Sequence, residues 1–264
     1  MKPPLRNILT IAGSDPCGGA GIQADLRTLQ AMGVHGMAVI TALTVQNTTG
    51  LRSGNPIAPE LVAEQLDFLL DDIVPDALKT GMLGTSGIVQ VVAERVRKYG
   101  LKNLVVDTVI QASDSTLLLD DDAVGVVREQ LLPLAHVVKP NMEEAARLCG
   151  FKVCDIDDMM RAAEAIHALG AAHVIITGGH MKGCDQSIDL LFDGKGHHLL
   201  PAHRLAGRED VHGTGCIFSA ALAAALGLGE DMLSAAEHAK NFVYKAIQHP
   251  HTPGKGRSIS NTVK

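Results

Sequence analysis

His212-Gly213-Thr214-Gly215-Cys216-Ile217-Phe218-Ser219-Ala220 runs directly into an alanine-rich segment that ends at Leu226. Two glycines that flank a threonine just before an apolar helical run let backbone N–H groups approach a ligand at the positive end of the helix dipole. Fixed amides of this kind would stabilise the negative charge that develops on a phosphoryl group during transfer. The stretch therefore predicts a strand-to-helix turn of an α/β fold that can also bind an anion.

Cys216 falls in the first turn of this expected helix. There the helix dipole and nearby N–H groups lower the pKa of a thiol, so Cys216 could act as the general base for a substrate hydroxyl. The alternative is structural, because glycine-rich turns before alanines usually serve close helix packing, and a cysteine in such a helix is usually a small core residue. For this stretch alone the structural interpretation is favoured. The other motifs of the chain decide between it and the catalytic interpretation.

The composition is that of an ordinary globular protein of 264 residues, long enough for one large domain or two small ones. A net charge of -6 without a basic cluster argues against nucleic acid as a partner, and the basic tail residues Lys255, Arg257 and Lys264 are expected to be solvated. Without a signal peptide or a membrane-length apolar run, we expect a cytoplasmic protein with no membrane partner. Five scattered cysteines indicate neither a disulfide framework nor a zinc site.

Short apolar runs alternate with longer amphipathic stretches along the chain. They predict strands at 8–12, 37–40, 104–106, 136–138 and 174–176, and helices at 22–32, 59–70, 88–99, 123–132, 159–169 and 231–248. Such continuous Val/Ile runs between helices indicate a mostly parallel sheet covered on both faces, and Asp193-Gly194 indicates a short hairpin at one sheet edge. We expect a doubly wound α/β fold in a single domain, residues 1–250, followed by a frayed tail, residues 251–264.

Polar and glycine-rich segments follow the predicted strands, where doubly wound sheets bind ligands. These segments are Gly13 to Gly21, Thr41 to Asn47, Lys79 to Met82, Asp107, Lys139 to Asn141, and Thr177 to His180. The first has neither the Walker A lysine nor the G-x-G-x-x-G spacing, so it is not a P-loop or a dinucleotide fingerprint. Their clustering predicts one ligand site at this edge of the sheet.

Three acidic side chains are candidates within these segments. Asp25 could contact a small polar ligand or be a solvated helix residue. Asp107 could hold Mg²⁺ through water, although an aspartate at a strand end is also a common turn former. Asn141 and Glu144 could share the water shell of a metal, or they could form a capping box, which is the better interpretation of that pair alone.

Taken in order, these segments resemble the ribokinase-like family, and within it the hydroxymethylpyrimidine and phosphomethylpyrimidine kinases of thiamine biosynthesis. The resemblance covers almost the whole chain and favours the functional interpretation of the opening stretch. It rests on Thr10 to Pro16 with Gly18 to Leu26, Ile40 to Leu43 with Gln46 to Thr48, Lys79 to Leu83, Pro140-Asn141 with Glu144-Ala145, Gly178 to His180, and His212 to Cys216.

The resemblance implies ATP-dependent phosphorylation of 4-amino-5-hydroxymethyl-2-methylpyrimidine and of its monophosphate, with Mg²⁺ as cofactor. It implies Cys216 as the base, with an anion hole formed by Gly213, Thr214 and Gly215. It implies pyrimidine binding by Asp25, Gln46, Gly13 and Met82. It implies Mg-ATP binding by Asp107, Asn141, Glu144, Thr177 and Gly179, with Asp107 and Glu144 contacting the metal.

Two departures from the family pattern lie on the nucleotide side. Relatives commonly carry Lys-Gly-Gly-His where this chain has Thr177-Gly178-Gly179-His180, so a cation that could contact ATP phosphates is missing. Relatives also carry a Ser-Gly or Thr-Gly pair where this chain reads Gln111-Ala112-Ser113-Asp114-Ser115. The departures leave open which residues contact the ATP phosphates, how fast the protein turns over, and which nucleotide it uses.

Two other functions stay open at this point. A pyridoxine or pyridoxal kinase would also act on a hydroxymethyl group of a flat heteroaromatic ring, although Gln46 favours a pyrimidine because it offers a polar partner for the amino group. A non-catalytic pyrimidine-binding regulatory protein is the other alternative, and the presence of Cys216 beside Gly-Thr-Gly argues against it. The edge hairpin and the small apolar helices would be compatible with a homodimer.

Overall fold

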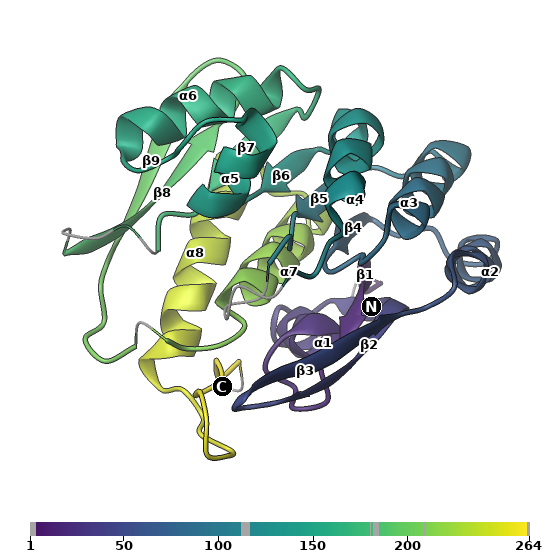
Figure 1. Cartoon of the computed structure of the whole chain (residues 1–264), viewed down its shortest axis with the longest axis horizontal. Coiled ribbons are helices and arrows are strands. Elements are labelled where there is room, and N and C mark those ends of the chain that lie inside the picture. The colour runs from purple at the N-terminus through teal and green to yellow at the C-terminus, as the bar shows by residue number, and fades with distance from the viewer. Residues whose placement is uncertain (1–3, 112–116, 180, 182–184, 209, 263–264) are drawn as a thin grey trace.

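The computed structural model describes residues 4–111, 117–179, 181, 185–208 and 210–262 (Figure 1). Ala112 to Ser115, His180 and Lys264, which the sequence analysis considered, lie outside the described residues, as does one of the five cysteines, Cys184. Among the described residues, no helix is long and apolar enough to cross a lipid bilayer.

The described strands form one nine-stranded sheet in the order β3-β2-β1-β4-β5-β6-β7-β8-β9. Neighbouring strands from β2 to β7 are parallel, whereas β3 at one edge and the β8–β9 hairpin at the other are antiparallel. This arrangement confirms the mostly parallel sheet and the edge hairpin. The strands are β1 Asn7–Ser14, β2 His35–Asn47, β3 Gly50–Pro56, β4 Ala77–Thr80, β5 Leu104–Asp107, β6 Val137–Lys139, β7 His173–Ile176, β8 Gln186–Phe192 and β9 His197–His203.

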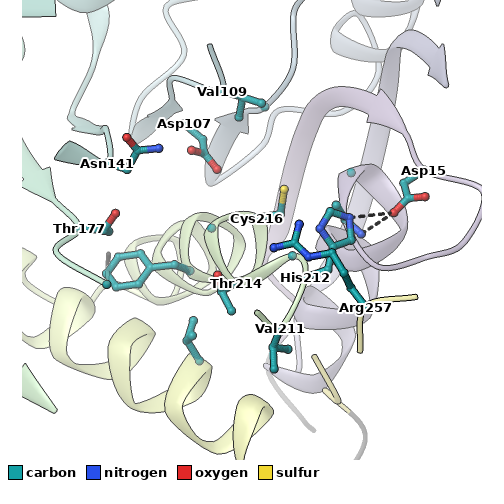
Figure 2. A pocket seen from close by; sticks show the side chains of 18 of the residues that line it. Asp15, Asp107, Val109, Asn141, Thr177, Val211, His212, Thr214, Cys216 and Arg257 are labelled. Carbon is teal, nitrogen blue, oxygen red and sulfur yellow. Dashed lines mark hydrogen bonds and ion pairs between the residues drawn. The ribbon is translucent and has the colours of Figure 1, made fainter. Parts of the chain in front are cut away.

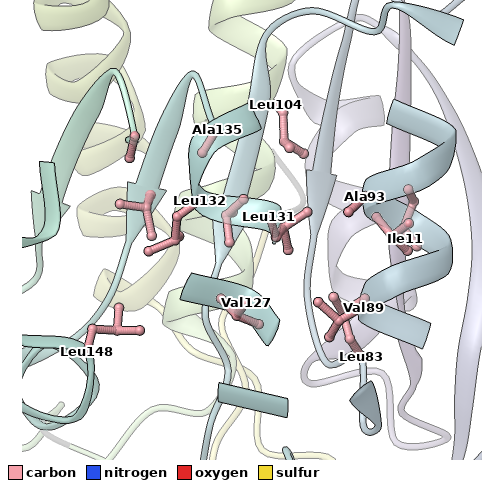
Figure 3. Packing of buried hydrophobic residues seen from close by; sticks show 14 of the residues in the cluster. Ile11, Leu83, Val89, Ala93, Leu104, Val127, Leu131, Leu132, Ala135 and Leu148 are labelled. Atoms are coloured by element: carbon pink, nitrogen blue, oxygen red, sulfur yellow. The ribbon is translucent and has the colours of Figure 1, made fainter. Parts of the chain in front are cut away.

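Helices cover both faces of the sheet, as expected (Figure 1). One face carries α2 Pro59–Leu70, α3 Ser86–Tyr99, α4 Asp121–Val126, α5 Met142–Cys149 and α6 Ile156–His167. The other face carries α1 Gly21–Ala31, α7 Thr214–Gly227 and α8 Met232–Gln248. Alternating strand residues supply the two cores. In β5, Leu104 and Val106 pack into the first core, which Figure 3 shows, and Val105 packs into the second.

The alanine-rich helix α7 is buried on nearly all sides. It packs against α1, α8, β4 and β5. A helix that is apolar all round has to be enclosed by protein, and alanine side chains let its neighbours approach closely. A Cβ atom on Gly227 would lie only 2.3 Å from Cδ1 of Ile8, so a larger residue there would have to displace the buried Ile8 side chain. The alanine-rich segment therefore does serve close helix packing, as the structural interpretation expected. Its first turn also lines the pocket described below.

Two elements differ from the sequence prediction. The helix expected at 123–132 is α4 followed by a π-helical turn, Val127–Leu131, and a 3-10 turn, Leu132–Leu134. Pro133 lacks an N–H and cannot continue a regular helix. The edge strand β3 was not predicted, because Gly50–Pro56 is almost entirely exposed and has no apolar alternation.

The C-terminal segment, expected to be frayed from about residue 250, instead packs against the body of the protein. The backbone N–H of Arg257 donates to the carbonyl of Thr48 at 2.8 Å, and that of His212 donates to the carbonyl of Ser258 at 2.8 Å. Ile259, Ser260 and Thr262 are buried. The segment therefore joins the β2–β3 turn to the loop before α7, and Figure 1 shows its end beside β3.

Candidate active site

A pocket of about 440 Å³ lies at the carboxyl ends of the parallel strands, where the sequence analysis expected a ligand site. Every predicted site residue except Asp25 lines it. Figure 2 shows Cys216 at the start of α7, with Asp107, Asn141 and Thr177 on one side and His212 with Asp15 on the other. One pocket thus brings together residues from both halves of the chain.

The start of α7 is open to the pocket. Gly213 precedes the helix with φ 85°, and a Cβ atom there would lie 1.8 Å from the carbonyl oxygen of Gly19. Only glycine fits that position. No described side chain caps this helix, so the amides of its first turn, which have no partner within a helix, face the pocket beside Thr214 and Gly215. This geometry suits an anion.

Cys216 lies half-buried on the pocket wall, but its pKa moves in the opposite direction to the one expected. Burial raises the pKa of the thiol to about 11, and the positive charge of Lys79 offsets only part of this rise. The carboxylates of Asp25 and Asp107 also act against the thiolate. The expectation of a lowered pKa was therefore wrong, because the loss of hydration outweighs the favourable helix start.

Asp25 lies beneath the pocket and does not line it, contrary to the direct pyrimidine contact that the resemblance implied. Its two carboxylate oxygens lie 3.1 and 3.0 Å from Nζ of Lys79, and Thr10 donates to it at 2.6 Å. Burial disfavours the charge of Lys79, but the carboxylate of Asp25 outweighs this and raises the pKa of Lys79. In this structure Asp25 holds a buried cation in place.

Asn141 and Glu144 form the capping box that the sequence favoured. Oδ1 of Asn141 accepts from the backbone N–H of Glu144 at 2.9 Å, and Oε2 of Glu144 accepts from that of Asn141 at 3.0 Å. Glu144 also accepts from Thr108 Oγ1 and from the N–H of Ile110. Burial raises the pKa of Glu144, and Lys139 opposes that shift.

Asp107 ends β5, and both of its oxygens also have protein partners. Oδ1 lies 2.9 Å from Nζ of Lys139, and Oδ2 accepts from Ser219 Oγ at 2.8 Å. Protein donors thus orient the carboxylates of both Asp107 and Glu144 at this edge of the pocket. No group of three or more His, Cys, Asp or Glu residues that could hold a metal occurs in the described part of the chain.

Gln46, on β2, lines the pocket on the side where His212 and Asp15 lie. Its Nε2 lies 3.1 Å from Nε2 of His212, and the same ring nitrogen lies 3.6 Å from Oδ2 of Asp15. Gly13 and Met82 line the pocket nearby, and a Cβ atom on Gly13 would lie 3.3 Å from the sulfur of Met82. Gly13 and Met82 therefore pack closely together in this part of the pocket wall.

Residues of β9, α7 and α8 also line the pocket. Apolar side chains of Val211, Phe218, Val243 and Ile247 line it. Lys240 and Asp189 form an ion pair at 2.8 Å on its wall, and both are largely buried. An apolar slot beside a charged pair suits a flat heterocycle that bears polar groups.

The sequence analysis assigned no role of their own to several residues that contact or support the pocket. Lys139, His212 and Arg257 line it, and Lys79 lies beneath it. The strand-end positions of Lys79 and Lys139 were a usable signal for both. Arg257 was expected to be solvated, and that expectation was wrong: it is partly buried, lines the pocket and pairs with Asp210, because the C-terminal segment folds back onto the protein.

Comparison with known proteins extends over nearly the whole chain. A family model described as phosphomethylpyrimidine kinase matches residues 15–261. A hydroxymethylpyrimidine/phosphomethylpyrimidine kinase of Bacillus subtilis is 41% identical over 253 residues, which are 96% of this chain and 93% of that protein.

Two solved structures are similar to this one. The pyridoxal kinase from Staphylococcus aureus in complex with AMP-PCP and pyridoxal has a TM-score of 0.90 at 35% identity, covering 98% of this chain and 94% of that chain. A phosphomethylpyrimidine kinase from Clostridium difficile has a TM-score of 0.81 at 36% identity, covering 92% and 99%. These likenesses confirm the ribokinase-like fold expected from the sequence.

Proposed function

Because the chain belongs to the phosphomethylpyrimidine kinase family, it is a kinase of thiamine biosynthesis, and we propose that it phosphorylates 4-amino-5-hydroxymethyl-2-methylpyrimidine and then the monophosphate of that compound. ATP is the phosphoryl donor. One observation supports the assignment most: the uncapped start of α7, with Cys216 in its first turn, lines the same pocket as Gln46 and the apolar side chains of α8.

The pyrimidine would lie against Gly13 and Met82, which line the pocket side by side. Its amino group is a donor and the adjacent ring nitrogen is an acceptor, so one side-chain amide can bind both. Gln46 is the amide on that wall of the pocket. With the ring edge against Gln46, the hydroxymethyl group would point toward Cys216.

In the transfer step, the γ-phosphorus forms a bond to the hydroxymethyl oxygen while its bond to the bridging oxygen of ADP breaks. The hydroxyl proton passes to the thiolate of Cys216, and the amides of Gly213, Thr214 and Gly215 stabilise the charge on the phosphoryl oxygens. Burial makes the Cys216 thiolate scarce but strongly basic. Asp25 acts through Lys79, whose charge favours that thiolate.

The apolar slot at Val211, Phe218, Val243 and Ile247 would hold the adenine, with Thr177 and Gly179 facing the phosphates. Mg²⁺ would neutralise phosphate charge while bound to the nucleotide and to water, beside the carboxylates of Asp107 and Glu144 that line this part of the pocket. Asn141 and Glu144 shape the phosphate end of the pocket through their capping box.

The decisive experiment is an ADP-release assay with Mg-ATP and three acceptors in parallel: hydroxymethylpyrimidine, its monophosphate and pyridoxal. We expect turnover of both pyrimidines, and Cys216→Ala should reduce it at least 100-fold while the thermal unfolding temperature stays within a few degrees. Folded protein that binds the pyrimidine but releases no ADP would overturn the catalytic assignment.

Pyridoxal kinase is the second candidate, and the structural likeness to the Staphylococcus aureus enzyme favours it. Turnover confined to pyridoxal would establish it. The homodimer and the cytoplasmic location expected from the sequence stay predictions, and so does the limit of the single domain at residue 250. Analytical ultracentrifugation of the purified protein would test whether it forms a homodimer.

A further inference from the structure

Lys139 places a positive charge at the anion end of the pocket. It is the last residue of β6, its side chain is only 4% exposed, and it lines the pocket. Its Nζ lies 3.5 Å from the position that a Cβ atom on Gly215 would occupy. The ammonium group is thus next to the first turn of α7, where the amides open toward a ligand.

The ammonium group stays charged and retains free hydrogen-bonding capacity. Burial disfavours its charge, but Asp107 and Glu144 outweigh burial and raise the pKa of Lys139. An ammonium group has three N–H donors, and Asp107 Oδ1, at 2.9 Å, takes one of them. The ion pair therefore orients the ammonium group without exhausting its donors.

Lys139 also lies next to the position where the expected cation is missing. Asn141 and Thr177 pair across adjacent strand ends, and the N–H of Thr177 donates to the carbonyl of Pro140 at 3.0 Å. The side chain of Thr177 carries no charge. Two other cations on the pocket wall are committed elsewhere, because Lys240 pairs with Asp189 and Arg204 donates to the carbonyls of Gly179 and Met181.

We propose that Lys139 is a catalytic residue that contacts the transferring phosphoryl group of ATP and supplies the cation that Thr177 does not. The inference rests on the proposed kinase function. As the γ-phosphorus bonds to the acceptor oxygen and separates from ADP, Lys139 keeps its proton and donates hydrogen bonds to the equatorial phosphoryl oxygens. A fixed charge in a partly dry site stabilises that transition state more than a mobile counterion would.

Nucleotide binding tests this contact without any acceptor, so it remains informative even if the pyrimidine is not the substrate. Calorimetry would compare AMP-PCP, ADP and adenosine on wild type and Lys139→Met, with exposed Lys98→Met as the matched control. We expect affinity for AMP-PCP to fall at least tenfold, affinity for ADP to fall less, and affinity for adenosine to change less than twofold. Equal affinity of folded wild type and Lys139→Met for AMP-PCP would overturn the proposal, as would an equal loss for all three ligands.

A charge swap tests the catalytic part. Lys139→Thr should lower kcat at least 100-fold, and the double variant Lys139→Thr/Thr177→Lys should recover at least tenfold of that loss. No recovery in a folded double variant that binds adenosine normally would count against the phosphoryl contact. Lys139→Met could fail to fold because it leaves Asp107 unpaired. In that case the double variant Asp107→Asn/Lys139→Met removes both charges, and its affinities for AMP-PCP, ADP and adenosine test the phosphoryl contact in the same way.

Discussion

Lys79 and Asp25 form an ion pair in which neither side chain has exposed surface, with Nζ 3.0 Å from one carboxylate oxygen and 3.1 Å from the other. They join the end of β4 to α1 beneath Cys216. The sequence analysis placed Asp25 against the substrate, whereas the structure gives it a cation to hold. This pairing fixes Lys79 as a positive charge that acts on the thiol.

Lys79→Met should lower the free energy of unfolding by about 3–5 kcal/mol, because it leaves the carboxylate of Asp25 buried without a counterion. Replacing both partners, as Lys79→Met/Asp25→Leu, should recover much of that loss. Denaturant titration of the two variants and wild type measures both effects. Equal stability of the single and double variants would show that the buried charge is not the cause.

Cys216 should react slowly with iodoacetamide near neutral pH, and its rate should keep rising up to about pH 11. The thiolate is the reactive form, and burial keeps it scarce below the raised pKa. Mass spectrometry of timed digests follows Cys216, with exposed Cys154 as an internal reference. A rate for Cys216 that levels off below pH 8 would contradict the raised pKa.

Gln46→Met should reduce kcat/KM for hydroxymethylpyrimidine at least 100-fold and that for pyridoxal by less than tenfold. A methionine cannot pair with the amino group and the ring nitrogen of the pyrimidine, and a site built for such pairing depends strongly on it. Steady-state kinetics with both acceptors measures the ratio. An equal loss for both compounds would remove Gln46 from pyrimidine recognition.

Glu144→Ala should destabilise the protein by about 1–3 kcal/mol, because the N–H groups of Ile110 and Asn141 lose a buried acceptor. Glu144→Gln can keep most of the capping box and should cost less. The concentration of Mg²⁺ that gives half-maximal activity should stay within twofold in Glu144→Gln. A tenfold rise there would restore Glu144 as a contact of the metal.

Ile259→Asp should weaken pyrimidine binding at least tenfold, whereas Lys255→Ala, on the same segment but exposed, should not. Ile259 is buried, and its neighbours Ser258 and Ser260 hold the backbone of His212, which contacts Gln46. Calorimetry with hydroxymethylpyrimidine measures the effect. Normal binding by Ile259→Asp would mean that the C-terminal segment does not shape the site.

Much of the site could be predicted from the sequence because strand ends converge. In a doubly wound sheet the residues just after parallel strands meet at one edge, so Asp107, Asn141 and Thr177 were expected to lie together. Asn141 also carried a local signal, because a capping box depends only on neighbours in the chain.

The local sequence pattern thus determined the sheet, its two helical layers and the edge where the pocket lies. Hydrophobic periodicity and turn residues act over only a few neighbouring residues, so they can be read from the sequence. Only the tertiary structure decided which charges are neutralised and which side chains meet solvent. Asp25 and Lys79 are 54 positions apart, and Thr48 bonds to Gly256 across 208. Ion pairing and hydration depend on distance in space and on burial, so the raised pKa of Cys216 and the place of Lys139 followed from packing alone.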